Sequence, residues 1–378
     1  MIPTCNEPAR ERWGGPEGSG LSERSEFTGS RSAPPIAPED GGRFSERRPR
    51  VHVTPRFLLE SGELLQFVRQ AYFLDGELNE RRDNLVVVFH ALTGSADAAG
   101  DWWKEVVGPG RALDTTRYAV LCANLLGSCY GSTGPAERPG QPFPRVGTRD
   151  MARLVYALVR ELEVESVALA VGGSLGGMVA LEWAASFPAL TRSTLAFAAP
   201  AAHTAAAIGW NHVQRRMIRA AGEEGLEIAR MVGMLTYRTA DELEGRFGRR
   251  RDGEGFEVGA YLSRHGQKLR ARFDTTSYLA LLDAMDAHDV GRGRDGVARA
   301  LRAVRGRLTG VGIPGDLLYS DADVRRWTAA AGAEYREIRS IHGHDAFLLE
   351  GAQVAALVGE ALTAAEDQRR PVALGRPA

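Results

Sequence analysis

Short apolar runs recur along the chain and alternate with longer segments of helical periodicity. The runs at 84–90, 118–123, 167–171, 195–199 and 307–313 are almost continuously apolar, as strands covered on both faces of a sheet require. Two further predicted strands, 57–60 and 64–72, flank a turn, and 150–162 reads as an amphipathic helix. This alternation predicts a mostly parallel sheet with helices on both faces.

A long segment with helical periodicity separates the predicted strands at 195–199 and 307–313. Residues 201–305 contain helix candidates at 210–220, 222–236, 241–247 and 276–287. A helical insertion between late strands predicts a lid over the carboxyl edge of the sheet, where open α/β sheets bind their ligands. The predicted organisation is a core from 51–200 and 306–366, interrupted by a lid at 201–305.

Both ends of the chain differ from this core in composition. Residues 1–50 mix Pro, Gly, Ser, Arg and Glu without hydrophobic periodicity, and such a segment buries too little apolar surface to offset its ordering entropy. It also lacks the apolar stretch of a secretory signal. We therefore expect a disordered N-terminal tail at 1–50 and a flexible tail at 367–378.

Overall charge and cysteine usage exclude several classes of protein. The 378 residues carry a formal net charge of -1, so no global field attracts nucleic acid or an anionic membrane surface. The apolar runs are shorter than the ~20 residues of a membrane span. Cys5, Cys122 and Cys129 are too few for a disulfide framework, which favours a reducing compartment. The prediction is a cytoplasmic protein without nucleic-acid or membrane partners.

The stretch VALAVGGSLGGMVALEW, residues 167–183, runs from an apolar strand through glycines into a helical pattern. Gly172, Ser174 and Gly176 fit the G-x-S-x-G pattern of a nucleophile elbow, in which a sharp strand-to-helix turn exposes a serine. The flanking strand and helix are the context that such a motif needs. Ser174 is the candidate nucleophile, and a plain strand–helix turn remains the alternative.

A serine hydroxyl needs a base, and the base needs an orienting carboxylate. Asp316 follows the strand at 307–313, whereas Asp321 and Asp323 read as the first turn of the next helix. His342 and His344 follow the last predicted strand, and His344 precedes a helix-like run. We predict Asp316 and His344 as the partners of Ser174, with His342 left as the alternative base.

An acyl-transfer site also needs amide donors for an oxyanion. One donor is the amide of Leu175, directly after the serine, and the other is expected from the loop HALTG, residues 90–94. The dipeptides 288–289 and 344–345, each His-Asp, raise the alternative of a metal pair. No further histidine or carboxylate cluster completes such a ligand set.

Taken together, the segments from 57 to 349 resemble the homoserine O-acyltransferase (homoserine O-acetyltransferase) family of the α/β-hydrolase fold. The resemblance rests on DGELNERRDN, HALTG, GPGRALDT, NLLGSCYGSTGP, GGSLGGMVALEW, TYRT, RFDTTSYLALLDAMDAHD and GHDAFL. It implies catalysis by Ser174, Asp316 and His344, an oxyanion hole from the Leu92 and Leu175 amides, and a homodimer formed through the lid. It also implies that Arg238 holds an amino-acid carboxylate and Asp345 its ammonium group.

The implied reaction is transfer of an acetyl group from acetyl-CoA, as co-substrate, to the hydroxyl of L-homoserine on the route to methionine. No permanently bound cofactor or metal is implied. L-Serine as acceptor, succinyl-CoA as donor, or a serine esterase remain alternatives, because residues 95–97, 220–226 and 314–319 depart from the family pattern. Several cations are candidates for the CoA phosphates: Arg264, Lys268, Arg270 and Arg272.

Overall fold

An eight-stranded sheet forms the centre of the structure, which is a computed structural model that describes residues 47–137, 140 and 142–369. The strand order is β1-β2-β4-β3-β5-β6-β9-β10. The β1–β2 and β2–β4 pairs are antiparallel and all other pairs are parallel. The strands are β1 (Arg50–Leu58), β2 (Leu64–Asp75), β3 (Leu85–Phe89), β4 (Ala119–Ala123), β5 (Val167–Gly173), β6 (Thr191–Phe197), β9 (Arg307–Gly312) and β10 (Glu334–Glu337).

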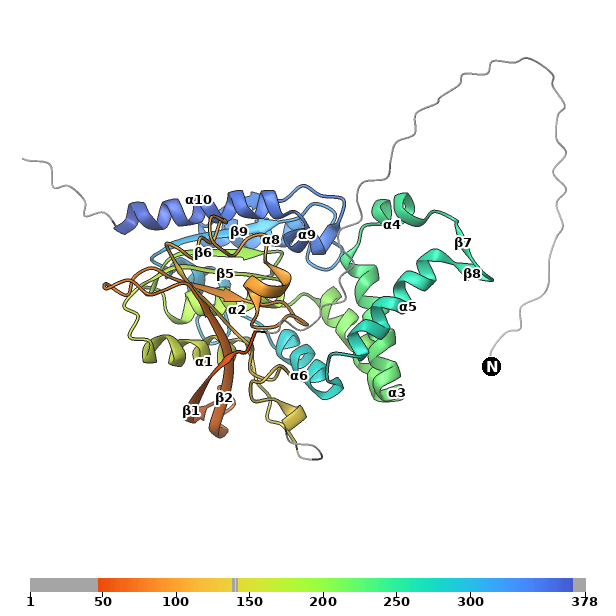
Figure 1. The fold of residues 1–378 in the computed structure, drawn as a ribbon, viewed down its shortest axis with the longest axis horizontal. Helices are drawn as coiled ribbons and strands as arrows, with labels where there is room; N and C mark the ends of the chain where they lie inside the picture. Colours follow the sequence, from red (N-terminus) through yellow and green to blue (C-terminus); the bar gives the residue numbers. More distant parts are fainter. Residues whose placement is uncertain (1–46, 138–139, 141, 370–378) are drawn as a thin grey trace, which may run out of the picture. The chain divides into compact units, whose positions relative to one another are not determined.

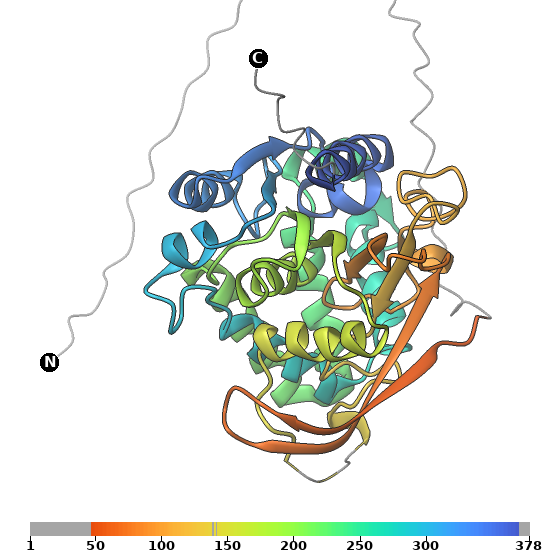
Figure 2. The same cartoon turned by 90° about the vertical axis from the view of Figure 1, so that its left-hand side faces the viewer.

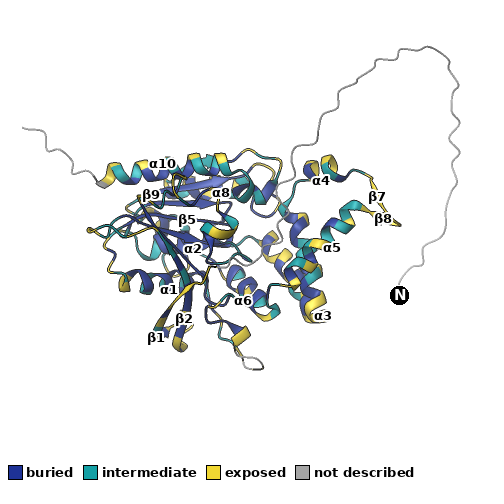
Figure 3. Cartoon of the chain, viewed as in Figure 1, coloured by how far each residue is buried: buried dark blue, intermediate teal, exposed yellow. Residues whose placement is uncertain are grey.

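Helices cover both faces of this sheet because its central strands are apolar on both sides. Val86 and Val88 of β3 pack in one cluster with α10 (Gly351–Arg369). Leu85 and Val87 point to the other face and pack in a second cluster with α1 (Thr148–Glu161), α2 (Leu175–Ser186) and α8 (Asp321–Ala331). Figure 1 shows the sheet with α10 on one side and α1 on the other. The strands are accordingly buried in Figure 3. The predicted fold class, a mostly parallel sheet with helices on both faces, is confirmed.

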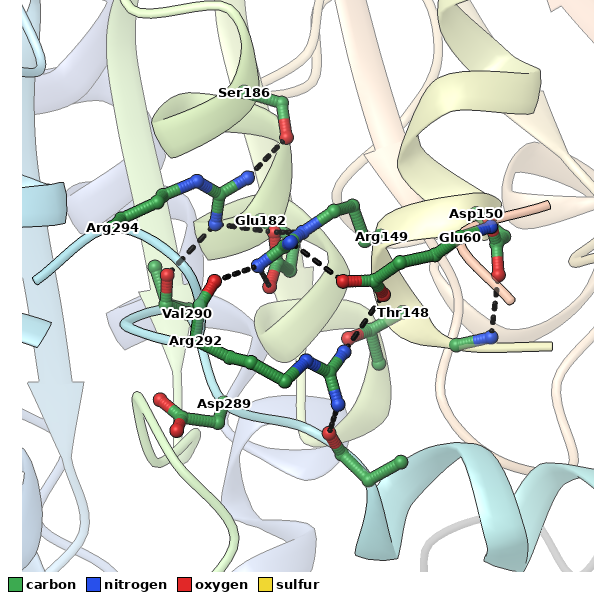
Figure 4. Close-up of polar contacts among 12 residues, drawn as sticks. Glu60, Thr148, Arg149, Asp150, Glu182, Ser186, Asp289, Val290, Arg292 and Arg294 are labelled. Carbon is green, nitrogen blue, oxygen red and sulfur yellow. Dashed lines mark hydrogen bonds and ion pairs between the residues drawn. The ribbon is translucent and has the colours of Figure 1, made fainter. Parts of the chain in front are cut away.

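Helix α2, which begins directly after Ser174, is tied to its neighbours by a buried ion network (Figure 4). Glu182 is completely buried, and its carboxylate accepts hydrogen bonds from Arg149 of α1 at 3.1 Å and from Arg294 at 2.8 Å. Arg149 also binds Glu60 at 2.6 Å, and Glu60 in turn binds Arg292 at 2.7 Å. The network joins α2 to α1, to the β1–β2 turn and to the loop at 289–294.

The edges of the sheet extend beyond the sequence prediction. The β1–β2 hairpin, orange in Figure 2, forms one edge, and β10 forms the other. The predicted tail 1–50 was too long, because β1 begins at Arg50; residues 1–46 lie outside the described residues. Backbone pairing with β2 orders this edge strand despite its polar composition. Strand β10, with the sequence EYRE, carried no apolar signal and was not predicted.

The C-terminal tail was also predicted to begin too early. Helix α10 continues to Arg369, so 367–369 are helical, and 370–378 lie outside the described residues. Glu366 ties this end of the helix to the core, because it binds Arg117 at 2.7 Å and the Tyr118 hydroxyl at 2.5 Å.

The lid is helical, as its periodicity indicated. The predicted helices 210–220 and 222–236 form one element, α3 (Ala205–Tyr237), broken at Gly222, where φ is 58° and ψ is -124°. Helices α4 (Ala240–Phe247) and α6 (Thr275–Asp286) match predictions, whereas α5 (Glu257–Arg270) and the short hairpin of β7 (Arg251–Asp252) and β8 (Gly255–Phe256) were not predicted. Helix α7 (Val297–Arg302) packs against α2 and α8 of the core.

Over the described part of the chain, no individual helix has the length and apolar character of a membrane span. The segments Gly343–Leu349 and Gly351–Gln368 together have the length and apolar character of a span, but they are bent by 72° relative to each other.

Candidate active site

Ser174 lies at the apex of a sharp turn between β5 and α2. Its φ of 55° and ψ of -123° are strained for a residue with a side chain. The turn requires close packing: a Cβ atom on Gly176 would collide with the Phe89 carbonyl, and one on Gly173 would collide with the Phe347 ring. The glycines therefore allow β5, β3 and the C-terminal loop to meet around the serine.

Asp316 and His344 are brought together by the loops after β9 and β10. Asp316 Oδ2 lies 2.7 Å from His344 Nδ1, and both side chains are buried. The backbone amides of Leu318 and Tyr319 donate to Asp316 Oδ1 at 2.8 and 2.9 Å. His342 instead places Nδ1 3.1 Å from Glu242 Oε1. Of the two candidate bases, His344 is thus the one that contacts Asp316.

The surroundings of His344 leave its outer nitrogen available for proton transfer. Burial lowers the pKa of His344, but the charge and hydrogen bond of Asp316, with the charge of Asp345, outweigh this effect and raise it above its ordinary value. Because Asp316 accepts from Nδ1, the Nε2 atom is left for proton transfer. The Phe347 ring packs against His344 at 5.7 Å and also covers Gly173, which places the imidazole beside the elbow.

Within the described residues, Ser174 Oγ has no hydrogen bond to His344. Catalytic hydrogen bonds are often long before substrate binds and tighten only in the complex. The structure therefore brings the acid and the base into contact, and places the serine at the same edge of the sheet.

The HALTG loop follows β3, the neighbour of β5, at this edge. His90 is buried, donates from Nδ1 to the Ala91 carbonyl at 2.8 Å, and accepts at Nε2 from the Leu125 amide at 3.0 Å. Burial lowers the pKa of His90 to about 4, so the ring stays neutral and serves as a structural clamp. Leu175 is the first residue of α2, where backbone amides have no acceptor within the helix.

Arg238 and Asp345 are also brought together, and a third residue joins them. Arg238 Nη2 lies 3.1 Å from Asp345 Oδ2, and Nη1 lies 3.1 Å from Glu242 Oε1. Glu242 is buried on α4, whereas the neighbouring acids Asp241 and Glu244 are exposed. Sequence reasoning missed Glu242, because nothing in the motif distinguishes it from these exposed neighbours.

The cations considered for the CoA phosphates have different surroundings. Arg270 is exposed and pairs with Glu223 at 3.3 Å and Glu227 at 3.7 Å. Arg272 binds the carbonyl of Thr93 in the HALTG loop at 2.8 Å. Nearby on α5, burial together with the charges of Arg230 and Lys268 lowers the pKa of His265 to about 4.

The His-Asp dipeptides do not form metal sites among the residues that the structure describes. His288 Nε2 donates to the Pro200 carbonyl at 3.1 Å, and its Nδ1 accepts from the Thr148 hydroxyl at 2.8 Å. Across those residues, no group of three or more His, Cys, Asp or Glu side chains is arranged to hold a metal ion.

Comparison with known proteins identifies the family. A family model described as "alpha/beta hydrolase fold" matches residues 84–218. The homoserine O-acetyltransferase of Thermobifida fusca is 44% identical over 351 residues, which cover 82% of this chain and 93% of that protein. The chain belongs to the homoserine O-acetyltransferase family.

Solved structures agree with this membership. The homoserine O-acetyltransferase of Staphylococcus aureus is similar with a TM-score of 0.73 and 29% identity, covering 87% of this chain and 97% of that one. Esterase E22 is similar with a TM-score of 0.75 and 19% identity, over 83% and 99% of the two chains. At that identity the likeness shows the fold alone, so the fold does not decide which acceptor takes the acyl group.

One departure from the homoserine O-acetyltransferase family pattern has a local structural account. In residues 95–97, Asp97 is buried and caps a short π-helix, Ala98–Trp102, by accepting from the Gly100 amide at 2.9 Å. The Trp102 indole donates to the Ser95 carbonyl at 3.0 Å. The altered residues thus order the segment directly after the HALTG loop.

Proposed function

We propose that this protein transfers an acetyl group from acetyl-CoA to the hydroxyl of L-homoserine, through an acyl-serine intermediate, on the route to methionine. Membership of the homoserine O-acetyltransferase family supports the reaction. The observation that carries it is the Arg238–Asp345 ion pair beside His344, because a hydrolase has no use for paired charges of opposite sign next to its base.

In the first half-reaction, His344 Nε2 takes the proton of Ser174 as Oγ attacks the thioester carbonyl. The oxyanion of the tetrahedral intermediate accepts from the Leu92 and Leu175 amides, each worth about 10²- to 10³-fold in rate. CoA leaves with the proton from His344. In the second half-reaction, His344 takes the proton of the homoserine hydroxyl as its oxygen attacks the acyl carbonyl. His344 then returns that proton to Ser174 Oγ as the bond between Oγ and the acyl carbon breaks, which releases the ester and free Ser174. Acetyl-CoA acts as co-substrate, and the mechanism uses no resident cofactor.

Binding of the acceptor exchanges one ion pair for two. Glu242 occupies Nη1 of Arg238, and Nε is buried without a hydrogen-bond partner among the described residues. The acceptor carboxylate takes the Nη2–Nε edge in the two-pronged geometry that guanidinium favours, and its ammonium takes Asp345. Opening the Arg238–Asp345 pair otherwise leaves Asp345 without its cation and Arg238 with Glu242 alone, which is costly where both side chains are largely withdrawn from water. An acceptor therefore needs both of its charges.

This requirement gives a direct test with wild-type enzyme. CoA release from acetyl-CoA is measured with L-homoserine, with 4-hydroxybutyrate, which lacks the ammonium group, with 3-amino-1-propanol, which lacks the carboxylate, and with water alone. The proposal expects fast release only with homoserine. Equal rates with and without homoserine identify an esterase and contradict it.

Donor and acceptor alternatives are separated in the same assay. Acetyl-CoA and succinyl-CoA are each compared with L-homoserine and L-serine by kcat/KM. The proposal expects the acetyl-CoA and homoserine pair to have the highest value. A higher kcat/KM with L-serine would make serine the acceptor, and a higher kcat/KM with succinyl-CoA would make succinyl-CoA the donor. Either result leaves the acyl-serine mechanism in place.

We further propose a homodimer formed through the lid, in the cytoplasm. Helix α3 exposes several large apolar side chains: Ile208, Trp210, Val213, Ile228 and Leu235. Burying such side chains against a second copy gains roughly 25 cal/mol per Å² of apolar surface. Light scattering should give twice the chain mass for the wild type and the single mass for Trp210→Glu; a monomeric wild type contradicts the proposal.

A further inference from the structure

Arg272 is held in a fixed position within the lid, between α5 and α6. Its backbone amide donates to the Leu269 carbonyl at 3.0 Å, in the turn that ends α5. The next residue, Phe273, is buried, and Asp274 caps α6 by accepting from the Ser277 amide at 2.6 Å. The end of α5 and the start of α6 thus fix the backbone position of Arg272.

The guanidinium of Arg272 reaches two loops of the core. Nη1 donates to the Thr93 carbonyl at 2.8 Å and to the Tyr130 hydroxyl at 2.7 Å, and Nη2 donates to Thr93 Oγ1 at 3.2 Å. Burial raises the pKa of Tyr130 to about 12, so the phenol stays neutral. The Tyr130 ring packs edge-on against Phe273 at 5.4 Å, which fixes it to the lid as well.

These contacts complete the support of the HALTG loop. On the core side, the Ala91 carbonyl accepts from His90 Nδ1 at 2.8 Å and from the Gly94 amide at 2.9 Å. The Leu92 N–H belongs to the same peptide group as that carbonyl. On the lid side, the carbonyl of Thr93 is held by Arg272. Leu92 therefore lies between two fixed points, one from the core and one from the lid.

We propose that Arg272 is a positioning residue for the oxyanion hole, through which the docked lid fixes the Leu92 amide relative to Ser174. The inference rests on the role of Leu92 in the proposed function. An oxyanion donor acts only when its hydrogen points at the developing charge, so a loop displaced by a fraction of an ångström loses much of that donor's effect. Arg272 acts through Thr93 and does not touch the substrate.

The test compares Arg272→Gln with Arg272→Lys and with the control Arg299→Gln, whose arginine is exposed on α7 and pairs with Asp295. Two readouts are used: the rate at which a fluorophosphonate labels Ser174, and kcat and KM for acetyl transfer. Arg272→Gln should slow labelling and lower kcat by about 10- to 100-fold. This loss is smaller than the roughly 10²- to 10³-fold expected when an oxyanion donor is removed entirely, because the Leu92 amide remains present but is less well positioned. KM for acetyl-CoA should stay near the wild-type value, and Arg272→Lys should recover part of the rate.

Two results overturn the proposal. A raised KM for acetyl-CoA with unchanged labelling makes Arg272 a phosphate-binding residue instead, and unchanged labelling and kcat remove any role in the site. Labelling needs neither homoserine nor CoA, so a wild type that is labelled but does not acetylate homoserine contradicts the proposed function and leaves this inference intact.

A more conservative variant, Tyr130→Phe, keeps the test valid if Arg272→Gln does not fold. Tyr130→Phe removes one acceptor of the guanidinium and leaves Arg272 and Thr93 in place. It should slow labelling less than Arg272→Gln, without lowering Tm much, because a single hydrogen bond contributes little to net stability. If Arg272→Gln unfolds, an unchanged labelling rate in Tyr130→Phe and in Arg272→Lys contradicts the proposal.

Discussion

Glu182 and Asp316 are both buried carboxylates of the core, yet their charges are balanced in different ways. Glu182 is bound by Arg149 and Arg294, two side chains that stay charged at any pH the protein experiences. Asp316 is bound by two backbone amides and by His344, a side chain that gains and loses a proton near neutrality.

This difference separates anchoring from chemistry. The arginines around Glu182 bind its carboxylate from two sides, so the network of Figure 4 fixes α2, the helix that begins after Ser174. Asp316 instead has a partner with a second nitrogen free for proton transfer. For these two carboxylates, the permanent cations accompany structural support and the titratable partner accompanies the candidate reactive site.

Among the substitutions that test this difference, Asp316→Asn should have the largest effect, and the effect should be on kcat. An amide at this position stabilises the wrong tautomer of His344 and no longer balances its positive charge, so kcat should fall by about 10⁴-fold, as in serine proteases. The free energy of unfolding should change much less. Steady-state kinetics and urea unfolding check the two sides; an Asn variant with nearly full kcat contradicts the assignment.

The pH dependence of the same pair follows from the raised pKa of His344. His344 must be neutral to accept a proton, so kcat/KM should fall as pH drops through a value above about 6.5, the ordinary histidine pKa. Without the Asp316 charge, the residual activity of Asp316→Asn should fall at a lower pH. A pH profile of both proteins tests this, and an unchanged midpoint contradicts it.

Glu182→Gln should affect stability and spare chemistry. It removes the carboxylate that the half-buried Arg149 and Arg294 share, which costs about 1–3 kcal/mol in the free energy of unfolding, because Arg149 keeps Glu60. The kcat of the folded enzyme should stay close to that of the wild type. Urea unfolding and active-site labelling separate the two effects; a large fall in kcat without loss of stability makes Glu182 part of the site.

Arg292→Gln should have the smallest effect, because Arg292 lies at the exposed margin of the same network. Its side chain is 44% exposed and pairs with Glu60, and such pairs contribute about 0–1 kcal/mol. Thermal unfolding in low and high salt measures this. A loss as large as that of Glu182→Gln means that the network acts as one unit.

Most of the core was predictable from sequence because buried strands are apolar along their whole length, as in 84–90 and 118–123. Strand β10 was missed because its four residues are half-buried and polar, so backbone pairing with β9 rather than composition makes it a strand. Helix α5 was missed for a related reason: it is mixed in composition, and its packing against α3 fixes it.

The residues of the candidate site likewise fall into those that the sequence indicated and those that only the structure shows. The place of Ser174 at a turn was predictable because the turn dictates its local sequence, and Asp316 and His344 were candidates because they come after the predicted strand at 307–313. Glu242 and the position of Arg272 were not predictable, because Glu242 lies against His342 and Arg272 binds Thr93, and both contacts join residues far apart in the sequence. The choice between His342 and His344 likewise needed the hydrogen bond to Asp316.

The central claim, that Ser174 carries an acetyl group destined for an amino acid, is tested most directly by mass spectrometry of the intact protein. After brief mixing with acetyl-CoA, the protein should gain the mass of one acetyl group on Ser174, and Ser174→Ala should gain none. Homoserine should then remove that mass far faster than water does, with O-acetylhomoserine as the product. Failure to acylate Ser174, or removal at the same rate without homoserine, contradicts the account.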